Sequence, residues 1–482
     1  MRGATLPQLW TDLAVTAVTA DSRAAGPGAL FVAIPGTRQD GRAFIGQAVA
    51  AGAVAVLAPP GTLWPENVPA RPLIEDPNPR RALARAAAAL AGRQPRQVVA
   101  VTGTNGKTST VEFLRQIWTQ AGHRAASLGT LGLTAAGFPS GAGLTTPDPV
   151  NLAAMLAALA AAGIEHAAME ASSHGLDQFR LDGVRPAAAA FTNLTRDHLD
   201  YHRTEAAYRA AKLRLFSEIL PPGAVAAINA DMDPETLAQL RGIAIRRRLR
   251  LLTVGEAGTA IRLLSATPRP DGQELKIEVH GARSSIALAL PGRFQADNAL
   301  LAAGLALALG DTGAIDRLQY LTGVRGRMEL AARLANGAAV YVDYAHTPDA
   351  LERLLLALRP HTSGKLHLVF GAGGDRDRGK RPLMGAIAAR LADAAIITDD
   401  NPRTEDPAAI RAAIRQACPV AAEIGDRAAA IAAALSDLGP GDVLAVAGKG
   451  HEQGQTIGAT VLPFDDAGII RRLTGHIPVG GA

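Results

Sequence analysis

The ten residues VTGTNGKTST, Val101–Thr110, decide which fold the centre of the chain can adopt. The apolar run QVVA (97–100) precedes them, and the helical pattern VEFLRQIWTQAG (111–122) extends from them. A strand, a glycine-rich turn and a helix in this order form the context that a phosphate-binding loop requires. The common pattern G-x-x-x-x-G-K-[ST] needs a glycine at Val101, whereas this chain has one at Gly103. The stretch is therefore an imperfect match or the loop of another kind of ATPase.

Two glycines, a lysine and a threonine predict the chemistry of this loop. Gly103 and Gly106 let backbone N–H groups turn inward, and the dipole of the following helix favours a bound phosphate. The Lys107 ammonium can reach the β- and γ-phosphates, and the Thr108 hydroxyl can bind Mg²⁺. The simpler alternative is a strand–helix turn with a chance lysine, which the flanking pattern disfavours.

Short apolar runs that end in polar residues recur along the chain. One series comprises QVVAVTG (97–103), HAAME (166–170), AAAAFTNLT (187–195) and AVAAINAD (224–231). Helical patterns separate these runs, which is the alternation of a doubly wound parallel sheet. A second series comprises AAVYVDYAHT (338–347), KLHLVFGAGGDRD (365–377), DAAIITDDNPR (393–403) and DVLAVAGKGHE (442–452). Functional residues are expected at the carboxyl ends of such strands.

The two series, and the different pattern of strands and helices before them, predict three α/β domains with the bounds 1–92, 93–325 and 326–482. The first mixes short strands with helical runs, and RQPRQ (93–97) indicates a linker after it. Residues 260–290 alternate in polarity and predict an antiparallel annex to the second domain. A chain of 482 residues is also too long for one ordinary core.

Composition excludes several classes of function. Hydrophobic residues make up 48% and charged residues 19%, which is typical of globular proteins. The net charge is only +5 and aromatic residues are 4%, so a nucleic-acid-dependent ATPase is disfavoured. The single cysteine, Cys418, permits no intramolecular disulfide. The N-terminus lacks a signal-peptide core and no run predicts a membrane span, so we expect a cytoplasmic protein without membrane insertion.

A metal site is predicted beside the phosphate loop. Glu170 ends one strand of the first series, and Asn193, Asp197 and His198 follow the next one. Oxygen ligands with retained waters suit Mg²⁺, and an imidazole at a neighbouring strand end can join them. Lys212, in the helical pattern TEAAYRAAKLRLF (204–216), has the appearance of a solvated helical lysine, and nothing in its spacing distinguishes it.

Taken together, these motifs resemble the Mur ligase family. GTNGKTS (103–109) is similar to that family's phosphate loop, a form shared with folylpolyglutamate synthetases. Further similar strings span the chain: DSRAAGPGALFVAIPGTRQDG (21–41), LTTPDP (144–149), MEASSHGL (169–176), FTNLTRDHLDYH (191–202), GRMEL (326–330), VDYAHTPDAL (342–351), GAGGDRDRGKRPLMG (371–385), TDDNPRTEDP (398–407) and AGKGHE (447–452). The loop therefore belongs to a different lineage and is not a decayed one.

The resemblance implies a fold and a reaction. The fold has a small α/β N-terminal domain that binds the UDP end of a sugar nucleotide, a central P-loop ATPase domain and a C-terminal Rossmann-like domain for an amino acid. The implied reaction is the ATP-dependent ligation of meso-diaminopimelate to the D-glutamyl carboxylate of UDP-N-acetylmuramoyl-L-Ala-D-Glu, through an acyl phosphate, in peptidoglycan precursor synthesis. It implies a cytoplasmic enzyme, here expected to be a monomer, whose partners are these small molecules and not nucleic acid.

The resemblance also assigns residues that the pattern alone does not. The lysine matching Lys212 is carbamylated by CO₂ in the family, which makes it an anion able to help bind a second Mg²⁺. Catalytic roles are implied for Lys107, Glu170, His198 and Lys212, and metal ligation for Thr108, Glu170, His198 and Lys212. ATP contacts are implied for Gly103, Thr104, Asn105, Gly106, Lys107, Thr108, Ser109, Asn298, Arg327, Asp343 and His346.

Two further sets concern the other substrates. Contacts to the UDP-sugar dipeptide are implied for Ser22, Thr37, Arg38, Gln39, Thr145, Thr146, Ser172, Gln178 and Arg180. Contacts to the amino acid are implied for Arg376, Asp400, Asn401, Pro402, Arg403, Gly448 and Glu452. In DDNPR (399–403), a planar Arg403 guanidinium suits the distal carboxylate of diaminopimelate, and Asp400 and Asn401 can accept from its ammonium group. DNPR alone would be an ordinary turn before a helix.

Two alternatives remain open from the sequence. One is another ligase of the family, adding L-lysine or a folate-type glutamate, which DNPR and the N-terminal strings disfavour. The other is a non-catalytic nucleotide-binding regulator. That interpretation would gain weight if Lys107, Glu170, His198 or Lys212 were missing, and all four are present.

Overall fold

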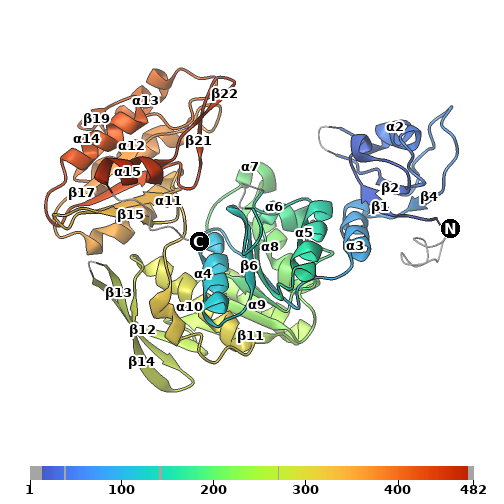
Figure 1. The fold of residues 1–482 in the computed structure, drawn as a ribbon, viewed down its shortest axis with the longest axis horizontal. Helices are drawn as coiled ribbons and strands as arrows, with labels where there is room; N and C mark the ends of the chain where they lie inside the picture. The colour runs from blue at the N-terminus through green and yellow to red at the C-terminus, as the bar shows by residue number, and fades with distance from the viewer. Residues whose placement is uncertain (1–12, 37–38, 140–143, 270, 476–482) are drawn as a thin grey trace. The chain divides into compact units, whose positions relative to one another are not determined.

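The computed structural model describes residues 13–36, 39–139, 144–269 and 271–475. The chain forms two compact units, residues 1–262 with 298–315 and residues 263–297 with 316–482, and Figure 1 labels many of their helices and strands. None of the helices in the described ranges combines the length and apolar character that crossing a membrane requires.

The first unit begins with a four-stranded parallel sheet in the order β1 (Ala17–Thr19), β2 (Ala29–Val32), β3 (Ala55–Ala58) and β4 (Leu73–Glu75). Every residue of β2 and β3 is buried, because helices cover both faces. α3 (Pro79–Ala91) packs on one face and α2 (Ile45–Ala50) on the other. Two short 3₁₀ turns, Ser22–Ala24 and Gly41–Phe44, connect these strands.

Seven strands of a ten-stranded sheet follow in the same unit, in the order β11-β10-β9-β5-β8-β6-β7. These strands are β5 (Gln97–Thr102), β6 (Ala125–Gly129), β7 (Gly132–Ala135), β8 (His166–Glu170), β9 (Ala188–Phe191), β10 (Val225–Asn229) and β11 (Arg250–Gly255). All neighbours are parallel except the edge pair β6–β7. The helices are α4 (Lys107–Gln120), α5 (Pro149–Ala161), α6 (Ser173–Asp177), α7 (Leu199–His202), α8 (Glu205–Arg214) and α9 (Pro234–Arg247), with a π-helical turn at Leu215–Ile219.

The topology of this sheet locates the phosphate loop. β5 lies between β8 and β9, so the chain builds the sheet outward from β5 in both directions. Loops that follow strands at such a reversal of order are where open α/β sheets bind ligands. The strand β12 (Ile261–Arg269) and the helix α10 (Arg293–Ala308) both run from one unit into the other.

The second unit contains a six-stranded sheet in the order β15-β16-β20-β17-β18-β19. Its strands are β15 (Glu329–Arg333), β16 (Ala339–Asp343), β17 (Leu366–Phe370), β18 (Ala394–Ile397), β19 (Ala422–Glu423) and β20 (Val443–Ala447), of which only the edge strand β15 is antiparallel. Its helices are α11 (Pro348–Leu358), α12 (Lys380–Leu391), α13 (Pro407–Arg415), α14 (Arg427–Ser436) and α15 (Asp466–Thr474), with 3₁₀ turns at Asp316–Tyr320 and Arg359–His361.

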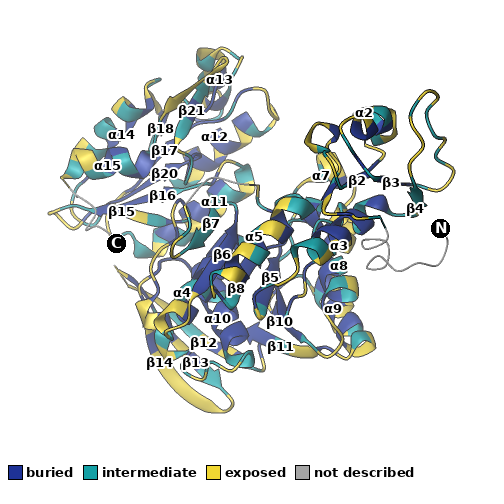
Figure 2. Ribbon diagram, turned by 45° about the vertical axis from the view of Figure 1, so that its right-hand side comes forward, coloured by how far each residue is buried: buried dark blue, intermediate teal, exposed yellow. Residues whose placement is uncertain are grey.

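Two antiparallel pairs also lie in this unit. β13 (Gly272–Val279) and β14 (Ala282–Leu288) are, with β12, the remaining strands of the ten-stranded sheet, and β21 (Gly454–Ile457) and β22 (Thr460–Pro463) form a sheet of their own. The first pair is the expected antiparallel annex, and it is exposed along much of β14, whereas β5 and β10 are dark blue in Figure 2. The predicted α/β fold class is confirmed, and each of the three expected domains has its own sheet. The boundaries after residues 92 and 325 stay a prediction.

Candidate functional site

The phosphate loop connects β5 to α4, and side chains from other segments pack closely against its two glycines. Gly103 has φ +143°, and a Cβ there would lie 1.9 Å from the Thr192 hydroxyl oxygen. Gly106 has φ +84°, and a Cβ there would lie 2.3 Å from Oδ1 of Asn298. Side chains at these positions would therefore be strained and would clash. Asn298, expected from the sequence to contact ATP, lies beside the loop.

Asn193 braces the loop from the end of β9. The Thr104 N–H donates to the Asn193 carbonyl oxygen at 2.8 Å, and the Asn105 N–H donates to Asn193 Oδ1 at 3.0 Å. The Thr104 hydroxyl donates to the Thr195 carbonyl oxygen at 3.1 Å. Ser109 is buried in the first turn of α4. The sequence placed Asn193 at this strand end but gave no hint that its role is to hold the loop.

Two lysines converge on the carbonyl oxygen of Gly103. Lys107 Nζ donates to it at 3.0 Å and to the Thr104 carbonyl oxygen at 2.8 Å. Lys212 Nζ, from α8, donates to the same Gly103 oxygen at 2.7 Å. Two amino groups therefore lie beside the loop, where the β- and γ-phosphates of a nucleotide are expected to bind.

Lys212 is the more deeply buried of the two lysines, with 1% of its surface exposed. Its Nζ lies 4.5 Å from the ring centroid of Tyr208, whose hydroxyl donates to the Thr104 hydroxyl oxygen at 3.2 Å. Burial lowers the pKa of Lys212 well below its ordinary value; the charge of Lys107 lowers it further, and Asp197 opposes the shift. A lowered pKa makes the deprotonated, nucleophilic amine more accessible than it is in a solvated lysine.

Glu170 ends β8 and lies within reach of the loop. Its Oε1 accepts from the Thr108 hydroxyl at 3.0 Å and from the Thr130 N–H at 2.8 Å, and its Oε2 accepts from the Thr130 hydroxyl at 3.2 Å. Only 1% of Glu170 is exposed, and a Cβ at Gly129 would lie 2.2 Å from its Oε1. A carboxylate and a threonine hydroxyl paired beside a phosphate loop fit the oxygen chemistry of Mg²⁺. Sequence reasoning missed Thr130 and Gly129.

His198 has different neighbours from Glu170. It has φ +52°, its Nε2 lies 3.5 Å from Asp197 Oδ2, and its ring meets that of His174 edge-on at 4.9 Å. Nearly half of its side chain is exposed. Within the described ranges, no three His, Cys, Asp or Glu side chains gather as a metal site. The metal role of His198 stays a prediction.

Five expected substrate residues of the first unit form one network with Glu170. The Thr145 and Thr130 hydroxyls are 3.0 Å apart, and the Thr146 hydroxyl donates to the Glu170 carbonyl oxygen at 3.1 Å and accepts from the Ser172 N–H at 3.0 Å. Arg180 Nη1 donates to the Thr146 carbonyl oxygen at 2.7 Å. Arg180 Nη2 also donates to Gln178 Oε1 at 2.8 Å. These residues, selected by resemblance, are thus contiguous in space.

The expected residues of the N-terminal sheet are less connected. Ser22 is buried, and its hydroxyl donates to Gln47 Oε1 at 2.8 Å. Gln39 is exposed, and its carbonyl oxygen accepts from the Gly36 N–H at 3.1 Å. Thr37 and Arg38 lie outside the described residues.

In the second unit, the three remaining residues that we expect to contact the nucleotide lie near the end of β16. Asp343 Oδ2 accepts from the Met328 N–H at 2.7 Å, and its Oδ1 accepts from the Ala345 N–H at 2.8 Å. The guanidinium carbon of Arg327 lies 4.7 Å from the Tyr344 ring centroid. His346 Nδ1 lies 2.8 Å from the Tyr344 carbonyl oxygen.

The two motifs expected to bind the amino acid meet around a lysine that sequence reasoning did not select. Lys449 is fully buried, and its Nζ donates to Asn401 Oδ1 at 3.2 Å and to Glu452 Oε2 at 3.1 Å. Asn401 Nδ2 donates to the same Glu452 oxygen at 2.9 Å. A Cβ at Gly448 would lie 2.5 Å from Asp400 Oδ2, so this glycine makes room for a buried carboxylate. The string AGKGHE was quoted for the resemblance, but nothing in it distinguishes the lysine from its neighbours.

Arg403 is held beside the same cluster. It has φ +53°, and its Nη1 donates to the Gly374 carbonyl oxygen at 2.7 Å. A Cβ at Gly373 would lie 2.8 Å from that Nη1, and one at Gly374 would lie 1.9 Å from the Pro402 carbonyl oxygen. The GAGG segment is thus glycine-rich because Arg403 and Pro402 pack on its backbone. Arg376, in the same loop, is exposed.

Three family models match the chain. They describe the Mur ligase family catalytic domain over residues 14–91, the Mur ligase middle domain over 101–306 and the glutamate ligase domain of Mur ligases over 326–450.

Curated relatives and solved structures cover nearly the whole chain. The chain is 55% identical to a UDP-N-acetylmuramoyl-L-alanyl-D-glutamate–2,6-diaminopimelate ligase of Caulobacter vibrioides, over 95% of this chain and 94% of the relative. It is 50% identical to the Rhizobium meliloti protein of the same name, over 99% of each chain. A solved structure with that name is 32% identical, with a TM-score of 0.71 and coverage of 96% and 95%. The MurF ligase of Thermotoga maritima, solved with ADP, shares the fold at 20% identity, with a TM-score of 0.62 and coverage of 91% and 95%. The chain belongs to the Mur ligase family.

Proposed function

We propose that this chain catalyses the ATP-dependent ligation of meso-diaminopimelate to the D-glutamyl carboxylate of UDP-N-acetylmuramoyl-L-Ala-D-Glu, in peptidoglycan precursor synthesis. Relatives named for this reaction match at 50–55% identity along nearly the full chain. The observation that carries the proposal is the assembly of the phosphate loop, the Glu170–Thr108 pair and the buried Lys212 in one site. A buried amine beside that loop favours a catalytic protein over a non-catalytic nucleotide-binding regulator.

The first step activates the D-glutamyl carboxylate. A carboxylate oxygen attacks the γ-phosphorus of ATP, an acyl phosphate forms and ADP leaves. Two anions approach each other in this step, so positive charge must offset their repulsion. Lys107, which now donates to the Gly103 and Thr104 carbonyl oxygens, is well placed to turn to the phosphates.

Mg²⁺ is held by Thr108 and Glu170 in this proposal, with His198 and Lys212 completing the ligand set. When bound, the ion neutralises phosphate charge and orients the oxygens that react. The neutral Lys212 amine adds to the carbon of CO₂ and loses a proton, which gives a carbamate anion. The carbamate anion can bind a cation, which a protonated lysine would repel.

The second step forms the amide bond. The amine of the incoming amino acid attacks the acyl carbon, and the tetrahedral intermediate expels phosphate. Arg403 binds the distal carboxylate of meso-diaminopimelate, and Asp400 accepts from its ammonium group. Asn401 has a supporting role, since its Oδ1 already accepts from Lys449 and from the Thr456 N–H. L-lysine lacks the distal carboxylate, so a lysine-adding ligase is the runner-up.

The domain roles extend this proposal. Residues 1–92 bind the UDP-sugar, residues 93–325 bind ATP and carry out the chemistry, and residues 326–482 bring the amino acid. We place the enzyme in the cytoplasm as a monomer that acts without nucleic acid or membrane insertion, in keeping with its scattered charge.

The test is ATP-dependent phosphate release with UDP-N-acetylmuramoyl-L-Ala-D-Glu and meso-diaminopimelate, L-lysine or no amino acid, with the product mass determined. Phosphate and a tripeptide product with diaminopimelate alone are expected. Equal turnover with L-lysine would overturn the role of Arg403 but keep the reaction class. No phosphate in any arm, with ATP still bound, would favour the non-catalytic alternative.

A further inference from the structure

Phe179 has a backbone conformation that bulky residues rarely adopt. Its φ is +59°, in the left-handed region, although it is neither glycine nor asparagine. It lies between Gln178 and Arg180, both expected to contact the UDP-sugar dipeptide. Strain of this kind persists only where the surroundings over-determine the conformation, and it gathers at functional sites.

Two arginines hold the Phe179 ring from different elements. The guanidinium carbon of Arg214 lies 4.1 Å from the ring centroid, and that of Arg81 lies 4.9 Å from it. Cations at these distances are attracted to the face of an aromatic ring. The Phe179 N–H also donates to the Leu176 carbonyl oxygen at 3.1 Å, which closes the turn.

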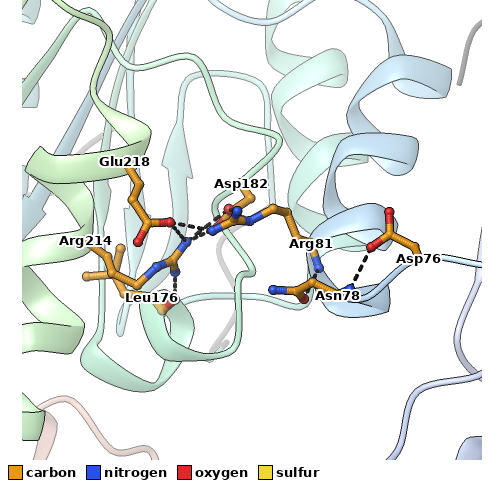
Figure 3. A network of polar contacts seen from close by, with 7 residues as sticks. All are labelled: Asp76, Asn78, Arg81, Leu176, Asp182, Arg214 and Glu218. Atoms are coloured by element: carbon orange, nitrogen blue, oxygen red, sulfur yellow. Dashed lines mark hydrogen bonds and ion pairs between the residues drawn. The ribbon is translucent and has the colours of Figure 1, made fainter. Parts of the chain in front are cut away.

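Asp182 holds both arginines in place. Its carboxylate lies 2.9 Å from Arg81 Nε and accepts from Arg214 Nη2 at 3.0 Å, and only 5% of its side chain is exposed. Glu218 bridges the same arginines from the solvent side, accepting from Arg214 Nη2 at 3.0 Å and pairing with Arg81 (Figure 3). Arg214 Nη1 donates to the Leu176 carbonyl oxygen.

The cluster ties together three segments that are far apart in sequence. Arg81 belongs to α3, where its N–H donates to the Asn78 cap at 3.0 Å (Figure 3). Arg214 belongs to α8, two residues after Lys212. Phe179 and Asp182 follow α6, and the Asp182 N–H donates to the Phe179 carbonyl oxygen at 3.3 Å. One contact set thus links the N-terminal sheet, the substrate turn and the helix that carries Lys212.

We propose that Arg81, Phe179, Asp182 and Arg214, termed here the Phe179 clamp, position Gln178 and Arg180 for binding the UDP-sugar dipeptide. The clamp fixes the turn, and the turn directs Arg180 Nη1 to the Thr146 carbonyl oxygen at 2.7 Å. These are positioning residues, since the clamp acts through its neighbours. The inference rests on the proposed function for the identity of the ligand, but the geometry of the turn is independent of it.

The test compares Asp182→Asn, Arg81→Met and Phe179→Leu with two controls. Arg85→Met removes an exposed arginine of the same helix, and Phe179→Tyr keeps a ring for both guanidinium groups. Calorimetry gives Kd for UDP-N-acetylmuramoyl-L-Ala-D-Glu and for ATP. We expect the three clamp variants to weaken dipeptide binding about tenfold, the scale of one cation–π contact or partly buried ion pair, with ATP Kd within about twofold and both controls unchanged.

Hydrogen exchange of the backbone amides of residues 178–180 supplies a readout without ligand. We expect faster exchange in the clamp variants and unchanged rates in Arg85→Met and Phe179→Tyr. Unchanged dipeptide Kd, or an equal loss for ATP, would overturn the inference, as would unchanged exchange. If the unmodified protein does not bind the dipeptide, the proposed function fails, and the exchange rates still decide whether the clamp orders the turn.

Discussion

Lys212 in the first unit and Lys449 in the second are both buried, yet their amino groups have opposite surroundings. Lys449 Nζ donates to the Glu452 carboxylate and to the Asn401 side chain. Lys212 Nζ donates to the neutral carbonyl oxygen of Gly103 and lies over the Tyr208 ring. Among the described residues, an ion pair is found for Lys449 but not for Lys212.

We infer from this difference that Lys449 is a structural lysine and Lys212 a reactive one. A buried ammonium paired with a carboxylate offsets its own desolvation cost and fixes the groups around it. A buried lysine without such a pair has its pKa lowered, as burial does for Lys212, and its neutral amine can react. In the second unit the buried lysine is thus paired with a carboxylate, whereas in the first unit it contacts a carbonyl oxygen and a ring, and we infer that this lysine is kept for chemistry.

The largest expected effect is on turnover by Lys212→Ala. We expect ligation to fall by about a hundredfold to a thousandfold, the scale on which one preorganised electrostatic group changes kcat. ATP should still bind, because Lys107 and the loop remain. The measurement is phosphate release, with ATP affinity determined by calorimetry. Lys276→Ala, at an exposed position of β13, is the matched control. Full activity of Lys212→Ala would rule out the carbamate.

The second effect concerns specificity in the charge-paired half. Arg403→Ala should raise KM for diaminopimelate by roughly thirtyfold to several thousandfold. This corresponds to a loss of about 2–5 kcal/mol of binding free energy, the cost of removing one partner of a buried charge pair. KM for ATP should change little. Arg403→Lys keeps the charge but not the planar fork, so an intermediate KM is expected. Equal changes for both substrates would refute the assignment.

The third effect compares the two lysines directly in stability. Lys449→Met should lower the unfolding free energy of the second unit by about 2–3 kcal/mol, below the full cost of breaking a buried pair because Glu452 is about one-third exposed. Lys212→Met should not destabilise the first unit, since an apolar group replaces a poorly solvated amine. Native-state hydrogen exchange in β20 and β5 gives both values. Equal losses in both units would erase the distinction.

The smallest effect is a pH dependence confined to the second unit. Burial, assisted by Arg327 and Arg325, lowers the pKa of His451 from 6.5 to about 4. Between these values the unfolded chain binds more protons, so stability is complete above pH 6.5 and falls as pH drops toward 4. After allowance for partial exposure, His451→Gln should remove about 1–2 kcal/mol of this loss. Denaturation followed at pH 7 and pH 4.5 measures it, and identical pH dependence in both proteins would contradict it.

The sequence predicted the parts of the site whose chemistry is contiguous in the chain. The phosphate loop and Glu170 at its strand end follow from local patterns, because a strand, a turn and a helix fix the geometry there. Lys212 could not be identified in this way, because the local sequence pattern around a helical lysine does not tell whether the lysine is buried or solvated. Only the resemblance selected it, and only the fold reveals its burial.

Contacts between distant segments were beyond sequence reasoning altogether. The Phe179 clamp joins residues 81, 179, 182 and 214, and no local pattern signals that a phenylalanine has a positive φ. Asn193 was placed at the right strand end, but its hydrogen bonds with Thr104 and Asn105 depend on the neighbouring strand. Lys449 was overlooked within a quoted motif, because its burial depends on packing against Asn401.

The most direct test of this account follows the oxygen that the reaction transfers. UDP-N-acetylmuramoyl-L-Ala-D-Glu labelled with ¹⁸O in the D-glutamyl side-chain carboxylate is incubated with ATP, Mg²⁺ and meso-diaminopimelate, and the released phosphate is analysed by mass spectrometry. An acyl phosphate formed at this loop predicts one ¹⁸O atom in each phosphate, matched by an equal amount of tripeptide product. Unlabelled phosphate would mean that water attacks ATP, which would contradict ligation at this site.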